Sequence, residues 1–313
     1  MKNKKILVTG SRGFLGSHFV EVLKNNGFKK ILTPSRAILD LLEIESIDKY
    51  LKVNKPEIVV HIAADIGGIG YSKKHPANQL YNNTLMNIMI QHSSYENGVE
   101  KFIGIGTVCS YPKFAKIPFK ESEIWNGYPE ETNASYGLSK KIMMEQTKAY
   151  NSQYGFNSIH LLMINLFGPG DDFDLETSHV IPAMIRKMDN AVINSLGSIT
   201  LWGDGSPTRE FLYVKDAARA ILKCMVEYNS PNPINIGNGK EISIKDLVKK
   251  IKLITGFNGK IVWDKSKENG QPRRCLDVSI LKNHLNFECK FDFEVGLKET
   301  YNFYKKNIKT LNK

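Results

Sequence analysis

Short apolar runs alternate with amphipathic stretches through the first half of the chain, as strands alternate with helices in an α/β protein. The apolar runs predict strands at 5–9, 30–35, 57–64, 102–106 and 158–169. The stretches between them predict helices ending near 27, over 44–53, over 76–95 and from Tyr136 to about 150. Near-continuous apolar strands joined by helices are typical of a parallel sheet covered on both faces. We therefore predict an α/β fold with a doubly wound parallel sheet.

The pattern becomes irregular after Gly170. It predicts a helix from about Ser178, a helix from Asp216 that follows the stretch 208–214, and a strand at 233–237 that returns to the sheet. A helix over 244–254, a strand at 260–263 and a helix near 293–304 follow. We expect residues 1–169 to form the first domain, with segments near 209–238 returning to it. Residues 170–208 and 239–313 then form a smaller C-terminal α/β lobe that binds substrate.

Composition restricts the classes of partner. The net charge of +11, from 43 Lys+Arg against 32 Asp+Glu, raises the prospect of a polyanionic ligand, but the lysines are scattered and no nucleic-acid motif occurs, so we expect no nucleic-acid partner. The four cysteines show no metal-binding spacing, so no metal site is predicted. No apolar segment approaches the roughly 20 residues that span a bilayer. We expect a cytoplasmic protein that does not bind membranes.

A glycine-rich turn directly follows the first strand and opens the first helix. Gly10, Gly13 and Gly16 suit a tight turn, a close approach of backbone amides to a pyrophosphate, and close helix–strand packing. A turn of this kind between a strand and a helix predicts a Rossmann dinucleotide-binding domain. The predicted cofactor contacts in and after this turn are Gly10, Arg12, Gly13, Phe14, Leu15, Gly16, Arg36, Asp40, Leu41, Ala63 and Ala64.

Two arginines indicate which dinucleotide binds. Arg12 lies in the glycine turn and Arg36 follows the second strand, where a carboxylate would bind a free ribose 2′-hydroxyl. Guanidinium groups at both positions suit a 2′-phosphate, so we predict NADPH as the cofactor. Asp40 could meet the adenine amine or cap a helix, and the sequence leaves both open.

A hydroxyl, a phenol and an ammonium are expected to meet at one end of the sheet. Tyr136 and Lys140 are four residues apart on a predicted helix, so their side chains share a face. Thr107 ends the strand at 102–106, where parallel sheets place ligands. We expect the Lys140 charge to lower the pKa of Tyr136, which then exchanges a proton with a carbonyl or alcohol. His61, in an apolar strand, is expected to be a hydrogen-bonded core histidine.

From these motifs the chain resembles the extended short-chain dehydrogenase/reductases, and within them the GDP-L-fucose synthases, which are GDP-4-keto-6-deoxymannose epimerase/reductases. The resemblance runs from about Lys5 to Asp277. The segments that carry it are 10–16, 63–69, 109–113, 131–140, 165–169, 178–180 and 202–212.

The resemblance implies an enzyme that uses NADPH to reduce C4 of a GDP-4-keto sugar, with Tyr136 protonating the new oxygen and Thr107 and Lys140 assisting. Cys109 and His179 match the pair that epimerises C3 and C5, where inversion needs a base on one face and an acid on the other. A homodimer through the helices beginning near 76 and 135 is also implied. Further contacts implied are Lys140, Asn165 and His179 to the cofactor, and Lys187, Trp202 and Arg209 to the substrate.

Departures from the family leave alternatives open. Thr107 stands where serine is usual and Ser110 where isoleucine is usual, so a 4-reductase that acts on another GDP-4-keto sugar, such as a heptose, without epimerisation would fit the same motifs. Val108 and Cys109 replace the Asp-Glu pair of the dehydratases, which argues against dehydration. A UDP-sugar 4-epimerase would hold NAD tightly. A non-catalytic dinucleotide-sensing protein would be free to lose Tyr136 or Lys140, and both are present.

Overall fold

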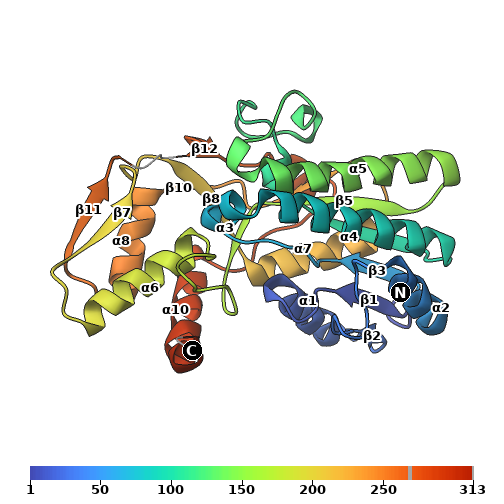
Figure 1. The fold of residues 1–313 in the computed structure, drawn as a ribbon, viewed down its shortest axis with the longest axis horizontal. Coiled ribbons are helices and arrows are strands. Elements are labelled where there is room, and N and C mark those ends of the chain that lie inside the picture. The colour runs from blue at the N-terminus through green and yellow to red at the C-terminus, as the bar shows by residue number, and fades with distance from the viewer. Residues whose placement is uncertain (267–269, 312–313) are drawn as a thin grey trace.

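The computed structural model describes residues 1–266 and 270–311. Its centre is a six-stranded parallel sheet in the order β2-β1-β3-β4-β5-β9 (Figure 1). The strands are β1 (Ile6–Thr9), β2 (Ile31–Leu32), β3 (Ile58–His61), β4 (Lys101–Thr107), β5 (Ser158–Met163) and β9 (Ile234–Ile236). This order confirms the predicted doubly wound sheet, including the late strand that returns beside β5.

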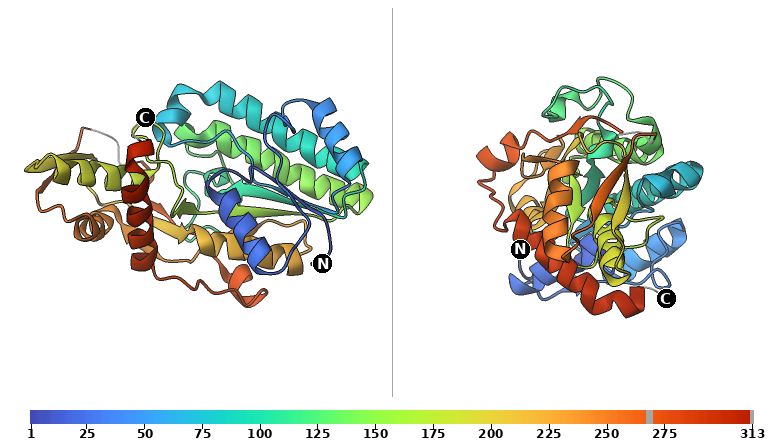
Figure 2. Two further views of the ribbon diagram at one scale, coloured as in Figure 1. Left: turned by 90° about the horizontal axis from the view of Figure 1, so that it is seen from below. Right: turned by 90° about the vertical axis from the view of Figure 1, so that its left-hand side faces the viewer.

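Helices cover both faces of this sheet. Alternate residues of each strand point to opposite faces, so each face has its own hydrophobic core. Ile6 and Val8 of β1 pack in one hydrophobic cluster with Phe19, whereas Leu7 packs in the other with Ile47. The left view of Figure 2 shows α4 and α5 on one side of the sheet and α1 and α7 on the other. The helices of this part are α1 (Phe14–Asn25), α2 (Ile44–Asn54), α3 (Ile69–Lys74), α4 (Pro76–Glu96), α5 (Ala134–Tyr154) and α7 (Val214–Glu227).

The predicted strand at 158–169 is divided at Ile164. The first part, β5, stays in the central sheet, and the second, β6 (Asn165–Phe167), leaves it to pair with β8 (Thr208–Tyr213). Strand β8 also pairs with β10 (Glu241–Ser243) and β12 (Arg273–Arg274), so it forms the middle of a second, smaller sheet. Within the segment near 209–238, β9 therefore joins the central sheet and α7 packs on α1, whereas β8 lies in the second sheet.

The rest of the chain forms a lobe at one end of the central sheet (Figures 1 and 2). It contains a two-stranded parallel sheet of β7 (Ser198–Trp202) and β11 (Lys260–Asp264). Its helices are α6 (Val180–Ile193), α8 (Ile244–Thr255) and α10 (Phe293–Leu311); the short α9 (Ser279–Asn283) packs beside β9.

Several predicted bounds are wrong, for local reasons. Strand β2 ends at Leu32 because Pro34 has no amide hydrogen for the ladder. Helix α3 was not predicted, since its sequence begins in the glycine-rich stretch at 67–70. Helices α6 and α7 begin at Val180 and Val214, two residues away from the predicted starts at Ser178 and Asp216.

Among the described residues, no helix is both long enough and apolar enough to cross a bilayer. The same part of the chain holds no group of three or more His, Cys, Asp or Glu side chains placed to bind a metal ion.

Candidate active site

A cavity of about 590 Å³ opens at the carboxyl ends of β1 and β3, where parallel sheets bind ligands. The predicted residues that line it are Gly10, Arg12, Gly13, Arg36, Asp40, Leu41, Ala63 and Ala64. The other predicted turn residues, Phe14, Leu15 and Gly16, form the first turn of α1. The lining residues that sequence analysis missed are Thr9, Ser11, Pro34, Ser35, Leu39, Leu42, Asp65, Tyr71, Asn82 and Met86.

The glycine turn has the geometry that a dinucleotide needs. Gly10 has a φ of +68°, and a Cβ there would lie 2.7 Å from the amide nitrogen of Ala63. A Cβ on Gly16 would lie 2.1 Å from the carbonyl oxygen of Gly10, so only glycine lets α1 start this close to the turn. The Ser11 hydroxyl is buried and has no hydrogen-bond partner among the described residues. An unpartnered donor at a helix N-terminus fits a phosphate group.

The two arginines lie on the rim of this cavity. Arg12 is exposed, and the Arg36 side chain, 76% exposed, forms an ion pair with Asp40 at 3.4 Å. Asp40 is not the helix cap that the sequence left open, because α2 begins at Ile44 after Glu43. Instead one Asp40 oxygen accepts the amide hydrogen of Leu42. Both guanidinium groups therefore remain accessible to an anionic ligand.

The structure brings the predicted chemical groups together. Thr107 ends β4, and its hydroxyl accepts the amide hydrogen of Cys109 at 3.1 Å in a short 3₁₀ turn. Helix α5 packs on that turn through Gly137, where a Cβ would lie 2.3 Å from the Cys109 carbonyl oxygen. Tyr136 is buried next to it, and the Lys140 ammonium nitrogen lies 5.9 Å from the centre of the Tyr136 ring.

Lys140 is held by a buried chain of hydrogen bonds that sequence analysis missed. Its Nζ donates to Asn87 Oδ1 at 3.2 Å, and the same oxygen lies 3.1 Å from His61 Nε2. His61 Nδ1 in turn lies 2.8 Å from the Thr9 hydroxyl. His61 is thus the hydrogen-bonded core histidine that the sequence predicted, and burial lowers its pKa to about 3, so it is neutral.

The expected effect of Lys140 on Tyr136 is not found. Burial, with the neighbouring Cys109 adding to it, raises the pKa of Tyr136 above its ordinary value. Burial also lowers the pKa of Lys140 to about 7, so the ammonium is only partly populated at neutral pH. A phenol with a raised pKa keeps its proton at neutral pH, which suits a group that donates a proton.

Cys109 and His179 approach the site from different elements. Cys109 is half-buried, and its sulfur accepts a hydrogen bond from Arg274 Nη1 at 3.7 Å. His179 precedes the first residue of α6, and its side chain is exposed. Desolvation by the surrounding residues lowers the pKa of His179, and the Asp172 carboxylate acts in the opposite direction. No hydrogen bond among the described residues joins His179 to Cys109.

The predicted substrate residues lie on the smaller sheet and lobe. Arg209 on β8 is largely enclosed, and burial with the nearby Arg274 lowers its pKa to about 10. Trp202 on β7 is 65% exposed, and Lys187 on α6 is half-buried. Asn165, predicted to contact the cofactor, begins β6 and donates its side-chain amide to the Glu210 carbonyl oxygen at 3.0 Å.

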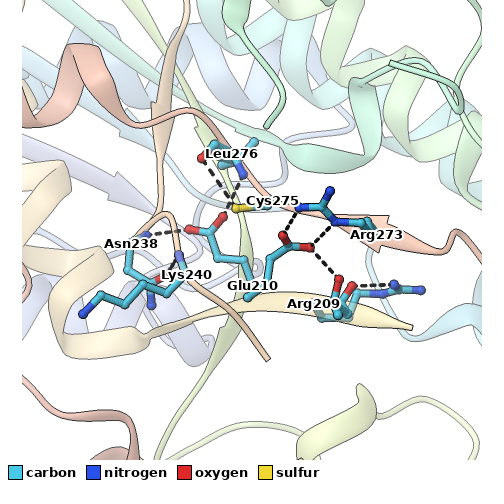
Figure 3. A network of polar contacts seen from close by, with 9 residues as sticks. Arg209, Glu210, Asn238, Lys240, Arg273, Cys275 and Leu276 are labelled. Carbon is cyan, nitrogen blue, oxygen red and sulfur yellow. Dashed lines mark hydrogen bonds and ion pairs between the residues drawn. The ribbon is translucent and has the colours of Figure 1, made fainter. Parts of the chain in front are cut away.

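Glu210 fixes the strand that carries Arg209 (Figure 3). Neighbouring strand residues point to opposite faces, so the Glu210 carboxylate is directed away from Arg209 into the interior, where it is fully buried. It accepts three backbone amides, from Asn238 at 2.6 Å, from Gly239 at 2.8 Å and from Leu276 at 2.8 Å. One carboxylate thereby ties β8 to the turn after β9 and to the segment after β12.

The sheet, the glycine turn and the Tyr136/Lys140 pair define a dinucleotide-dependent oxidoreductase of the short-chain dehydrogenase/reductase class. Residues 6–237 match the NAD dependent epimerase/dehydratase family, and the chain belongs to that family.

Known proteins resemble the chain over nearly its whole length. It is 37% identical to "GDP-L-fucose synthase 1" of Arabidopsis thaliana, over 98% of this chain and 95% of that protein. Among solved structures it resembles a GDP-6-OMe-4-keto-L-xylo-heptose reductase from C. jejuni, with a TM-score of 0.91, 29% identity and coverage of 98% and 99% of the two chains. A GDP-L-fucose synthetase from Naegleria fowleri bound to NADP has a TM-score of 0.91 at 28% identity, covering 100% of this chain and 97% of that one.

Proposed function

We propose that the protein reduces C4 of a GDP-4-keto sugar with NADPH, and that it also epimerises C3 and C5. The observation that carries the reduction is the buried Tyr136, which keeps its proton beside Lys140 and Thr107 at the carboxyl end of β4. The similarity to a GDP-L-fucose synthase and to a GDP-4-keto-heptose reductase supports a GDP-4-keto sugar as the substrate class.

Each residue then has a chemical role. When bound, the nicotinamide cofactor supplies a hydride to the carbonyl carbon. Tyr136 gives its proton to the oxygen that becomes the new hydroxyl, and Thr107 hydrogen-bonds the same oxygen. Arg12 and Arg36 bind the 2′-phosphate that distinguishes NADPH from NADH, and the Ser11 hydroxyl and turn amides hold the pyrophosphate.

The substrate lies between the two sheets in this proposal. Arg209 pairs with the diphosphate, because its guanidinium is enclosed and its Nη1 donates only to the Thr208 carbonyl oxygen among the described residues. Trp202 stacks on the sugar or base from the lobe, and Lys187 supplies a further positive charge.

Epimerisation uses Cys109 and His179, one as base and the other as acid. Protons next to a carbonyl are acidic, and inversion requires that they leave from one face and return to the other. A second candidate function is reduction of a GDP-4-keto heptose without epimerisation, favoured by the similarity to the heptose reductase.

The test is incubation of the protein in deuterated water with NADPH and either GDP-4-keto-6-deoxymannose or its heptose analogue. Loss of NADPH absorbance reports reduction, and deuterium at C3 and C5 of the product reports epimerisation. Reduction without deuterium favours the second candidate. No oxidation of NADPH with either sugar refutes both.

A tyrosine variant tests the proposed acid. Tyr136→Phe should lower kcat by roughly 10²–10⁴-fold. Tyr154→Phe, at the far end of the same helix, is the matched control and should retain full activity. A fully active Tyr136→Phe variant rules out the proposed acid.

We also propose a homodimer through α4 and α5 that works in the cytoplasm. Large apolar side chains are exposed on both helices, namely Leu80, Tyr81, Ile142 and Tyr154. All four cysteines are free, as is usual in a reducing compartment. Light scattering after size-exclusion chromatography should give the mass of two chains, and Ile142→Glu should give the mass of one.

A further inference from the structure

The hydrogen-bond chain that ends at Lys140 begins at the wall of the cavity formed by the carboxyl ends of β1 and β3. Thr9 ends β1 and lines that cavity, and it is in register with His61, which ends β3. The Thr9 hydroxyl is bonded to His61, and His61 is bonded to Asn87 of α4. Asn87 in turn is bonded to Lys140 of α5. The chain therefore joins the cavity wall to a helix that is not part of the sheet.

Each hydrogen bond in this chain has one possible direction. The Asn87 amide nitrogen donates to the Ser139 carbonyl oxygen at 3.2 Å, which leaves Asn87 Oδ1 to accept from Lys140 Nζ. An amide oxygen can only accept, so His61 Nε2 carries the ring hydrogen that points at Asn87 Oδ1. The ring is neutral, so His61 Nδ1 has no hydrogen and accepts from the Thr9 hydroxyl. One tautomer of His61 therefore satisfies every bond in the chain.

A second histidine in the same row of the sheet has no such bonds. His61 is in register with Gly104 of β4, and Gly104 is in register with His160 of β5. His160 is also fully buried, and burial together with the Lys140 charge lowers its pKa to about 3. Neither ring nitrogen of His160 has a hydrogen-bond partner among the described residues. Two neutral histidines thus lie near Lys140, and His61 alone of the two is bonded to the acceptor of its ammonium.

We propose that His61 and Asn87 are positioning residues that fix Lys140 beside Tyr136 during the proposed reduction. The proposal rests on that reduction and adds the groups that hold its lysine. The Lys140 charge lies at the end of a flexible four-carbon stem, and Asn87 Oδ1 is the one acceptor of its Nζ among the described residues. His61 holds that oxygen in place from β3, a strand that also leads into the cavity wall. The lysine on α5 is thereby set at a fixed place relative to the strands at the cofactor cavity.

The tautomer of His61 is measured without any sugar. In full-length protein that carries nitrogen-labelled histidine, NMR distinguishes a protonated from an unprotonated ring nitrogen, and loss of signals in His61→Gln identifies those of His61. The expected ring is neutral with its hydrogen on Nε2 between about pH 5 and pH 8, where an ordinary histidine titrates. A ring with hydrogen on Nδ1, or one that titrates in this range, overturns the proposal.

Steady-state kinetics measures the effect on the reaction. Asn87→Leu and His61→Leu should each lower kcat by roughly 10–100-fold, because a displacement of about 1 Å in an active site costs a factor of this order. KM for NADPH and for the sugar should stay nearly unchanged, since neither side chain lines the cavity. His61→Gln supplies one donor and one acceptor, as the neutral ring does, and should restore most of the activity that His61→Leu loses. A wild-type kcat in Asn87→Leu or in His61→Leu overturns the proposal.

Two control variants separate this role from packing. Gln91 lies one helical turn after Asn87 on α4 and is also fully buried. It joins α4 to α5 through the Thr147 hydroxyl at 3.1 Å, and not through Lys140. Gln91→Leu and His160→Leu should therefore keep the wild-type kcat. A loss in these two variants as large as that in Asn87→Leu overturns the proposal, because it would assign the effect to the packing of buried side chains.

A double variant tests whether Asn87 acts through Lys140. In a Lys140→Met background, Asn87→Leu should cause no further loss of kcat, because the group that it positions is already absent. Losses that multiply overturn the proposal. A wild-type protein that has the Nε2–H tautomer of His61 but oxidises no NADPH with either GDP-4-keto sugar overturns the proposed function alone.

Discussion

Replacing the active-site lysine should make the protein more stable and much less active. Lys140 is 1% exposed, and its Nζ has one hydrogen-bond acceptor among the described residues, Asn87 Oδ1. Lys140→Met removes the buried charge but leaves Asn87 Oδ1 satisfied, because His61 Nε2 still lies 3.1 Å away. The variant therefore removes a destabilising group without leaving a buried polar atom unpaired.

The size of the effect follows from the pKa of Lys140, which burial lowers from 10.5 to about 7. Each pKa unit corresponds to about 1.4 kcal/mol, so a protonated Lys140 costs the folded state up to about 5 kcal/mol at pH 7 and below. Between pH 7 and 10.5 the unfolded state binds more protons than the folded state, so this cost decreases as pH rises. It should fall to about 2 kcal/mol at pH 9.

Urea unfolding of wild type and Lys140→Met at pH 6.5 and pH 9 measures both values. The gain in the free energy of unfolding should be several kcal/mol at pH 6.5 and clearly smaller at pH 9, while kcat falls by roughly 10²–10⁴-fold. Lys141→Met is the matched control: burial lowers the pKa of Lys141 too, but its Nζ donates to the Ile124 carbonyl oxygen at 2.7 Å and lies 4.5 Å over the Trp125 ring, so its replacement should raise stability much less than Lys140→Met does. The reasoning is refuted if Lys140→Met is less stable than wild type. It is also refuted if the gain in the free energy of unfolding is the same at pH 6.5 and at pH 9.

Three further changes test the cofactor turn and the second sheet. Arg36→Ala should lower kcat/KM for NADPH by roughly tenfold or more and leave NADH nearly unaffected, because only NADPH carries the 2′-phosphate; steady-state kinetics with both cofactors check this. Glu210→Gln replaces one carboxylate oxygen by an NH2 group, which cannot accept the hydrogen of the backbone amide that it faces. The free energy of unfolding, measured in urea, should fall by about 1–3 kcal/mol. Gly16→Ala should weaken NADPH binding more than tenfold in a fluorescence titration, since its Cβ would lie 2.1 Å from the Gly10 carbonyl oxygen; unchanged binding contradicts the role given to this glycine.

Local pattern was enough to predict the central sheet, the glycine turn between the first strand and the first helix, and the position of Tyr136 and Lys140 on one helix. The strand before Gly10 and the helix after it are both read from contiguous residues, and Tyr136 and Lys140 are one helical turn apart. Strands of two or three residues such as β10 and β12 have no periodicity to detect, so the second sheet was not predicted. The division of β5 from β6 likewise depends on a partner strand some 45 residues further along the chain.

The missed site residues depend on contacts between distant positions. Asn87 meets Lys140 across 53 residues and Arg274 meets Cys109 across 165. Polar residues on a helix face or a short strand have no local signal that marks such contacts. The pKa of Tyr136 was predicted in the wrong direction for the same reason: it depends on how completely the fold buries the phenol, which spacing along a helix does not report.

The chain leaves the central sheet at Ile164, and this limits where segments of a related protein can be joined to it in a chimera. The strands β6, β8, β10 and β12 form one sheet, and in the chain they lie both before and after β9, the last strand of the central sheet. A chimera that exchanges substrate preference must therefore transfer the segment from Asn165 onward as a block, with Glu210 and all three of its amide partners from the same parent. A junction at 237, where the family match ends, would divide that sheet between two parents.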